Sequence, residues 1–202
     1  MQGNAIARDD GLLPGFADSV RDSQRCFRAV LDAMSNPGRI VRLTGLPQAP
    51  AGLDPATAAV CLSLVDFETA LWLPKAMRGG PAESYLRFHC GCPIASDASE
   101  AAFALVPGSA LPELAAFPIG HDQYPDRSAT VVLQVEDIRA DGGKRLTGPG
   151  IEAEARLAIG GLDDSFWAAQ RDNAALYPLG LDFIFTSGRD VAAMPRTTRV
   201  GD

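Results

Sequence analysis

Lysine and histidine are scarce in this sequence of 202 residues. Among the 18 basic residues only Lys75 and Lys144 are lysines, and the only histidines are His89 and His121. A Schiff-base mechanism with pyridoxal phosphate needs a lysine in a pocket, whereas both lysines lie in segments typical of solvent-exposed loops. A Ser-His or Cys-His mechanism has to use one of the two imidazoles. The sequence therefore offers few groups for covalent or acid-base catalysis.

The common signature motifs of nucleotide-binding proteins, zinc proteases and hydrolases are also missing. The sequence contains no G-x-x-x-x-G-K-[ST], G-x-G-x-x-G, H-E-x-x-H or G-x-S-x-G. A net charge of -7 without a run of Lys and Arg disfavours binding to nucleic acid. The longest apolar run, Ala56 to Val65, is far shorter than the ~18 residues of a membrane-spanning helix. We expect neither a nucleic-acid partner nor a membrane partner.

The four cysteines do not form a recognisable metal motif. No secretory leader precedes them, so we expect reduced thiols and a cytoplasmic protein. His89, Cys90 and Cys92 place three metal-ligand side chains close together, but a closed zinc site needs four ligands and normally a second paired cluster. Cys26 and Cys61 are isolated in separate helical segments. We therefore expect no bound metal.

The composition is that of an ordinary folded protein, with 47% apolar and 21% charged residues. The length favours one compact domain. The first residues mix charges, glycine and proline without periodicity, which predicts a flexible leader over residues 1–15 and a single domain over residues 16–202.

Apolar periodicity and capping residues predict four helices. Ser19 with Asp22 approximates a capping box at the start of the first helix. The second helix follows Asp54 and is apolar all round, as expected for a helix buried between layers. The predicted ranges are Ser19 to Met34, Pro55 to Val65, Pro81 to Phe88, and Asp163 or Asp164 to Ala175.

Strand patterns are interspersed with these helices from end to end. Residues 151–159 alternate between apolar and charged side chains, which predicts an edge strand or a projecting ribbon. The last two strands are expected to form a hairpin. The predicted strands are Arg39 to Thr44, Thr69 to Leu73, Ala101 to Val106, Thr130 to Val135, Ile151 to Ile159, Leu181 to Thr186 and Val191 to Met194. The order predicts a three-layer α/β/α sandwich on a mixed sheet.

Three segments have a composition suited to binding, and each has a structural alternative. Residues 146–150 (LTGPG) either present backbone N–H groups to an anion or form an ordinary turn. Residues 195–199 (PRTTR) suit phosphate or a carboxylate-bearing partner, or form a solvated tail. His89 either acts in catalysis or interacts with the last carbonyl groups of its helix.

Five short segments follow one another between about Phe16 and Val200. They are residues 27–38 (FRAVLDAMSNPG), 86–89 (LRFH), 145–151 (RLTGPGI), 177–182 (YPLGLD) and 194–198 (MPRTT). Together and in this order they resemble the PhnH family, and the resemblance covers nearly the whole chain.

The resemblance implies a subunit of the bacterial carbon-phosphorus lyase core complex in organic phosphonate catabolism. With its G, I and L partner subunits it would couple a phosphonate to the ribose of ATP with loss of adenine, in a transferase complex. The family also implies homodimer formation, docking on the I subunit, and a fold similar to the large domain of pyridoxal-phosphate-dependent transferases but without the cofactor. We expect the isolated chain to be inactive and its role to be structural or accessory.

The family provides no catalytic residue that maps onto this chain, so the expected site residues are polar positions within the matching segments. We expect them to contact substrate or a partner subunit, or to have a structural role: Arg87, His89, Asp182, Arg196 and Thr197. Two alternatives remain open, namely an autonomous enzyme of the pyridoxal-phosphate type and a stand-alone anion-binding module.

Overall fold

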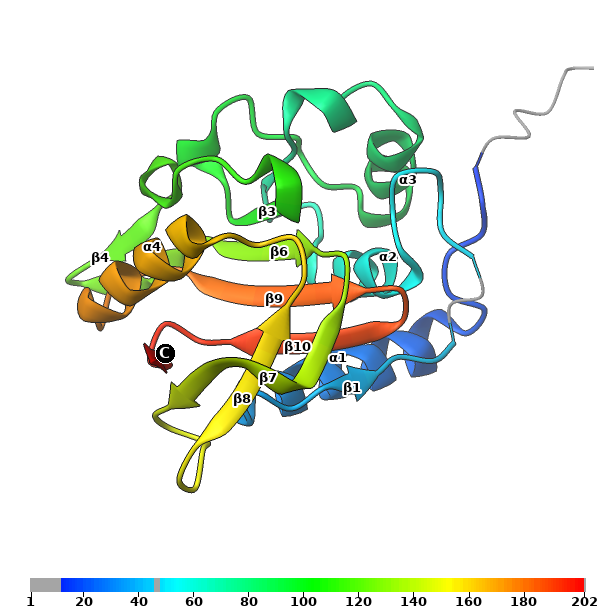
Figure 1. The fold of residues 1–202 in the computed structure, drawn as a ribbon. Coiled ribbons are helices and arrows are strands. Elements are labelled where there is room, and N and C mark those ends of the chain that lie inside the picture. Colours follow the sequence, from blue (N-terminus) through cyan, green and yellow to red (C-terminus); the bar gives the residue numbers. More distant parts are fainter. Residues whose placement is uncertain (1–11, 46–47, 202) are drawn as a thin grey trace, which may run out of the picture.

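The computed structural model describes residues 12–45 and 48–201, which fold as a mixed α/β protein (Figure 1). This part of the chain contains four α-helices, a six-stranded mixed sheet and two smaller antiparallel sheets. The α/β class and the mixed sheet predicted from the sequence are confirmed. Residues 1–11, most of the predicted leader, lie outside the described residues.

The six-stranded sheet has the order β1-β10-β9-β6-β3-β2. Four neighbouring strands are parallel, namely β2 (Leu71–Trp72), β3 (Phe103–Pro107), β6 (Thr130–Gln134) and β9 (Asp182–Ser187). β10 (Asp190–Met194) pairs antiparallel with β9, as the predicted hairpin requires, and β1 (Val41–Arg42) pairs antiparallel with β10. The middle residues of β3, β6 and β9 are buried, and all except Thr186 are apolar, because both faces of the sheet are covered.

One face of the sheet is covered by α1 (Ser19–Ser35), α2 (Pro55–Leu64) and α3 (Pro81–Cys90). Their buried side chains form one apolar core with inward-pointing strand residues such as Ile184. Asp18, one residue before the predicted cap, accepts a hydrogen bond from the backbone N of Arg21 at 3.0 Å and so begins α1. α2 is buried around most of its circumference, as its apolar sequence predicts.

The other face is covered by α4 (Asp164–Ala175) and by a three-stranded antiparallel sheet of β11 (Arg199–Gly201), β7 (Ile138–Thr147) and β8 (Ala155–Ile159). Phe166 of α4 packs edge-on against Phe183 and Phe185 of β9, with ring centroids 5.4 and 6.1 Å apart. These rings belong to a second apolar core. Alternate residues of β9 therefore serve opposite faces of the sheet.

Short irregular segments complete this second face. Between β3 and β6 the chain forms the 3-10 turns η3 (Gly108–Ala110) and η4 (Leu114–Ala116) and then the hairpin of β4 (Ile119–His121) and β5 (Tyr124–Ser128). His121 lies in this hairpin and is exposed. Two further 3-10 turns flank α3, namely η1 (Lys75–Met77) and η2 (Ala98–Glu100).

A polar network ties α2 to the centre of the sheet. Thr57 Oγ1 donates to Gln134 Oε1 at 2.8 Å and lies 2.7 Å from Thr186 Oγ1. The same Gln134 oxygen accepts from the backbone N of Asp54 at 2.7 Å. The Asp54 carboxylate accepts from the backbone N of Gly188 in the β9–β10 turn at 2.8 Å, and its side chain makes no cap hydrogen bond to α2. The helix start, β6 and the hairpin are thus held together by side-chain hydrogen bonds.

The structure differs from the sequence prediction mainly around β7 and β8. The alternating segment forms a strand only from Ala155. This strand, β8, lies at the edge of the small sheet, as the alternation of apolar and charged residues predicted. β7 was not predicted, because Asp141-Gly142-Gly143 has the composition of a turn. The register between β7 and β8 shifts here, and Gly143 has a φ of +68°. A Cβ at Gly143 would lie 2.3 Å from the carbonyl oxygen of Leu157, so only glycine fits.

Candidate functional site

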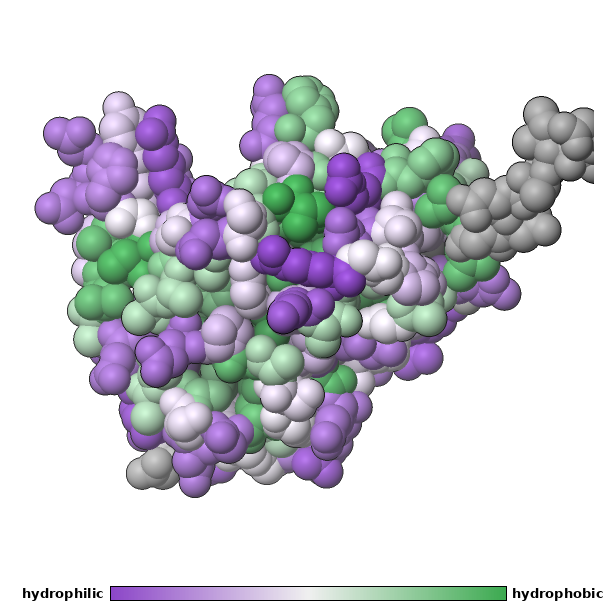
Figure 2. All heavy atoms as spheres, turned by 90° about the horizontal axis from the view of Figure 1, so that it is seen from above, coloured by the Kyte–Doolittle hydropathy of each residue, from purple (hydrophilic) through white to green (hydrophobic). Residues whose placement is uncertain are grey.

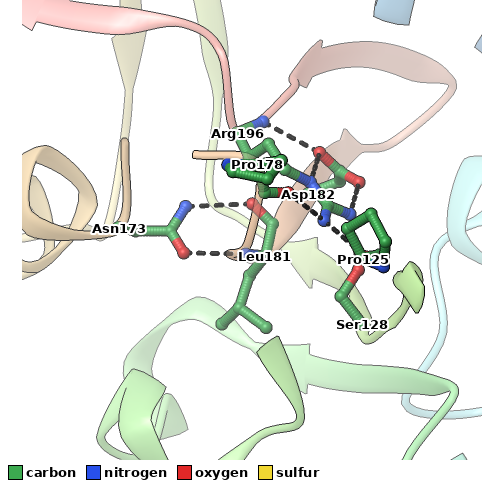
Figure 3. A network of polar contacts seen from close by, with 7 residues as sticks. All are labelled: Pro125, Ser128, Asn173, Pro178, Leu181, Asp182 and Arg196. Carbon is green, nitrogen blue, oxygen red and sulfur yellow. Dashed lines mark hydrogen bonds and ion pairs between the residues drawn. The ribbon is translucent and has the colours of Figure 1, made fainter. Parts of the chain in front are cut away.

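Arg196 and Asp182, two of the predicted site residues, form a shielded ion pair (Figure 3). Arg196 Nη2 donates to Asp182 Oδ2 at 2.5 Å and Nε donates to Oδ1 at 3.2 Å. The backbone N of Arg196 donates to the same Oδ1 at 2.8 Å. The side chains are only 13% and 18% exposed. Burial and two-point geometry make this the stronger kind of ion pair.

The remaining donors of the Arg196 guanidinium bind two other segments. Nη1 donates to the carbonyl oxygens of Pro125 at 2.8 Å and Pro178 at 3.3 Å. Nη2 also donates to Ser128 Oγ. Arg196 therefore joins the end of the β9–β10 hairpin to β5 and to the loop before β9 (Figure 3). These contacts favour the structural role among those expected for Arg196 and Asp182, and leave little of the guanidinium for an anion.

The segment after Arg196 is packed against the protein. Thr197 is half-buried and Thr198 is buried. The carbonyl oxygen of Thr198 accepts a hydrogen bond from Gln170 Nε2 of α4 at 3.1 Å. Residues Arg199–Gly201 then form β11, which pairs with β7. Of the two alternatives left open for residues 195–199, the solvated tail does not hold, because side-chain and strand contacts fix this segment on the protein.

Arg87 and His89 lie on α3, which is far from the C-terminal end of the chain in Figure 1. His89 Nε2 lies 3.0 Å from the carbonyl oxygen of Leu13, and the imidazole packs on Tyr85 with ring centroids 4.5 Å apart. Arg87 is exposed and pairs weakly with Glu83 at 3.5 Å. His89 thus holds Leu13 of the N-terminal segment on α3, and its role in binding stays a prediction.

The glycine-rich turn at residues 147–150 is used for close packing. Gly150 has a φ of +80°, and a Cβ there would lie 2.0 Å from the carbonyl oxygen of Ser35 at the end of α1. Gly148 has a φ of +132° and approaches the backbone of Thr197. The turn joins α1 to the C-terminal segment, which favours the structural alternative over an anion nest.

The four cysteines lie on or next to α1, α2 and α3 in the first core. Burial, with smaller effects of the neighbouring Cys92 and Cys26, raises the pKa of the Cys61 thiol from 9.0 to about 12. The hydrogen bond between the thiols of Cys90 and Cys92 raises the pKa of Cys90 and lowers that of Cys92. Among residues 12–45 and 48–201 no His, Cys, Asp and Glu side chains are grouped for metal binding.

A groove with a volume of about 710 Å³ opens beside α4. Its walls are α4, the turn at residues 161–163 and the η3–η4 segment, which is the green segment next to α4 in Figure 1. Apolar side chains form most of the walls, and carboxylates accompany them. The apolar group includes Leu111, Leu114, Leu162, Phe166 and Leu176, and the carboxylates are Glu113, Asp163 and Asp172.

A second surface feature is an apolar stripe on α1. Val20, Phe27 and Leu31 are 76%, 49% and 54% exposed. The buried side of the same helix consists of Asp22, Cys26, Val30 and Ala33. Elsewhere hydrophobic and hydrophilic side chains are mixed over the face shown in Figure 2. We call Val20, Phe27 and Leu31 the α1 stripe, and such exposed apolar groups on a regular element indicate an interaction surface.

The fold and these surfaces define a class of α/β protein. In this class the polar residues of the matching sequence segments, such as Arg196 and Asp182, stabilise the structure, and exposed apolar surfaces are available for contacts with other molecules. The family model described as "Bacterial phosphonate metabolism protein (PhnH)" matches residues 14–201. The chain belongs to the PhnH family.

Two relatives support this assignment. "Alpha-D-ribose 1-methylphosphonate 5-triphosphate synthase subunit PhnH" of Rhizobium meliloti (strain 1021) is 38% identical over 191 residues, which cover 92% of this chain and 93% of the relative. "Putative C-P lyase subunit protein HtxG" of Stutzerimonas stutzeri is 36% identical over 179 residues, which cover 88% and 85% of the two chains. The resemblance found in the sequence is thereby confirmed.

Sequence reasoning missed the groove and the α1 stripe. The groove joins positions from 108 to 181 that no local pattern connects. The stripe had a signal, because Val20, Phe27 and Leu31 lie on a different side of an ideal helix from Cys26, Val30 and Ala33. None of the helices in the described residues combines the length and apolar character that a bilayer span requires.

Proposed function

We propose that this chain is a structural or accessory subunit of an alpha-D-ribose 1-methylphosphonate 5-triphosphate synthase. In this proposal it acts with the G, I and L subunits of the carbon-phosphorus lyase complex when a phosphonate is coupled to the ribose of ATP and adenine is lost. The name of the Rhizobium meliloti relative, which is similar over 92% of this chain, supports the assignment. The isolated chain is expected to be inactive.

The contacts of the motif residues carry the proposal. Arg196 and Asp182 bind each other and the surrounding backbone, and His89 contacts the N-terminal segment. A catalytic site would instead direct such groups toward a common space where a substrate fits. Neither lysine lines the groove: Lys75 is exposed and Lys144 Nζ lies 3.6 Å from Asp164 Oδ1. These positions do not favour the pyridoxal-phosphate alternative.

The proposal extends to two finer points. A three-layer fold similar to the large domain of pyridoxal-phosphate-dependent transferases is supported by helices on both faces of the mixed sheet. Homodimer formation and docking on the I subunit are supported by the α1 stripe, since a subunit needs exposed apolar side chains to bury.

The α1 stripe provides the test. In the double variant Phe27→Ser and Leu31→Ser, two exposed apolar side chains are lost, so the free energy of unfolding should change little while association weakens at least about tenfold. Light scattering of the chain alone and with the I subunit measures association. Adenine release from ATP and methylphosphonate by the reconstituted subunits measures function.

The matched control is Phe67→Ser, which removes an apolar side chain that is 73% exposed outside the stripe. It should leave both association and adenine release within about twofold of wild type. Adenine release by the isolated chain, or full release by the other subunits without this chain, would overturn the proposal.

A further inference from the structure

The groove beside α4 has the size and wall chemistry of a binding site. Its volume of about 710 Å³ is within the usual range for ligand pockets, about 300–1,000 Å³. The buried ring of Phe166 forms part of the wall, and Leu176, 46% exposed, extends the apolar surface to the rim. A polypeptide segment with apolar side chains could therefore bury them here.

The charge of the groove has one sign. Glu113, Asp163 and Asp172 are exposed on its lining, and within residues 12–45 and 48–201 none of the three forms an ion pair. Hydrogen bonds from the Ser165 hydroxyl and from the backbone N of Phe166 lower the pKa of the Asp163 carboxyl, which keeps it ionised. The described lining residues include neither lysine nor arginine. An anion in this groove would meet repulsion without a compensating cation.

This charge pattern excludes the obvious small substrates. ATP and a phosphonate both carry negative charge and are bound in proteins by Arg, Lys or helix N-termini. The N-terminus of α4, which faces the groove, already has its N–H groups at Ser165 and Phe166 bound by Asp163. The groove therefore suits an apolar occupant with positive charge.

We propose that the groove beside α4 is a docking site for a polypeptide segment of another synthase subunit, with apolar side chains inserted between α4 and η4 and Lys or Arg residues facing Glu113 and Asp172. The inference rests on the proposed function, because it takes the partner from the same complex. Charge complementarity identifies the chemistry of the occupant.

A second copy of this chain is a poorer occupant. The α1 stripe is flanked by Arg21, Arg25 and Arg28, but α1 packs on the opposite face of the central sheet from the groove. Contacts between α1 of one copy and the groove of the next would join unlike surfaces and extend into an open chain rather than a closed dimer.

Two variants test the docking site with the full chain. Ala169→Trp fills the groove from within, and Asp172→Lys reverses one of its charges. Each should weaken binding to the remaining co-purified synthase subunits at least about tenfold, measured by calorimetry. The Asp172→Lys effect should shrink in high salt, because it is electrostatic and exposed.

The matched controls make the same changes outside the groove. Ala175→Trp adds the same ring at the exposed end of α4, and Asp141→Lys makes the same charge reversal on β7. Both should bind within about twofold of wild type. Thermal unfolding of all four variants tests whether each is folded. If Ala169→Trp does not fold, Ala169→Leu replaces it, and if Asp172→Lys does not fold, Asp172→Asn replaces it.

The outcomes separate the two proposals. If wild type does not bind the other subunits, the proposed function fails. If wild type binds and both groove variants bind equally well, the docking site is wrong while the subunit function stands. Two further results would overturn the docking site. One is binding of ATP or methylphosphonate to the isolated wild-type chain that is abolished by Ala169→Trp. The other is self-association, seen as a molecular mass of the isolated wild-type chain that increases with its concentration, if Ala169→Trp abolishes it.

Discussion

The two faces of the central sheet are covered in different ways. On one face α1, α2 and α3 pack side by side, and apolar side chains form the core between them and the sheet. On the other face α4, the small β7 sheet and irregular segments share the covering, and polar clamps such as Arg196–Asp182 hold them. The continuous helical layer leaves only outward-pointing side chains for contacts, whereas the composite layer leaves a groove.

Removal of the Arg196 side chain should have the largest effect on this difference. Arg196→Ala leaves the carboxylate of Asp182 buried without its cation, so unfolding should require about 3–5 kcal/mol less free energy. Urea titration measures the loss. Arg196→Lys should recover little, because one ammonium group cannot replace the several guanidinium donors.

Arg199→Ala is the control, since it removes an exposed arginine from the neighbouring strand β11. Its free energy of unfolding should stay within about 0.5 kcal/mol of wild type. Equal losses in the two variants would mean that the clamp does not hold the composite layer.

Alkaline pH should act on the helical face. The pKa of the Cys61 thiol is raised from 9.0 to about 12 in the folded chain, so between these values the unfolded chain loses a proton that the folded chain keeps. The free energy of unfolding therefore has its full value below about pH 9 and decreases as the pH rises, by about 2 kcal/mol from pH 9 to 11. Urea titrations across this range should show a flatter dependence in Cys61→Ala. Parallel curves would contradict the assignment to Cys61.

The polar tie under α2 should contribute least. Thr57→Val keeps the shape of the side chain but removes the hydroxyl that binds Gln134 and lies against Thr186, which should cost about 1 kcal/mol. Thermal unfolding detects the change, with the exposed Thr44→Val as control. A cost of about 3 kcal/mol or more would show that the helical face also depends on a polar clamp.

The regular parts of the fold were predictable because their side chains repeat with the period of the element. α1, α2 and the β9–β10 hairpin have such patterns together with caps or turns. β7 was not predictable from its sequence, because the shift in its pairing near Gly143 depends on the backbone of the opposite strand β8. Local sequence cannot show a contact made 14 or 15 residues away.

The candidate site was predictable only in part. Asp182 and Arg196 were selected from matching segments, and the predicted hairpin could have placed them side by side, because Phe183 pairs with Met194. Pro125, whose carbonyl oxygen accepts a hydrogen bond from Arg196, lies in the β4–β5 hairpin, which no sequence pattern indicated. The groove depends on how η4 packs against α4, which follows from tertiary packing rather than from any periodicity.

The short outer strands of the large sheet limit how copies of this protein can aggregate. β1 and β2, at its two edges, each contain two residues. Such an edge offers few unpaired backbone N–H and C=O groups on which a strand from another chain could add. A protein that exposes apolar side chains for assembly is thereby protected against runaway β-sheet polymerisation.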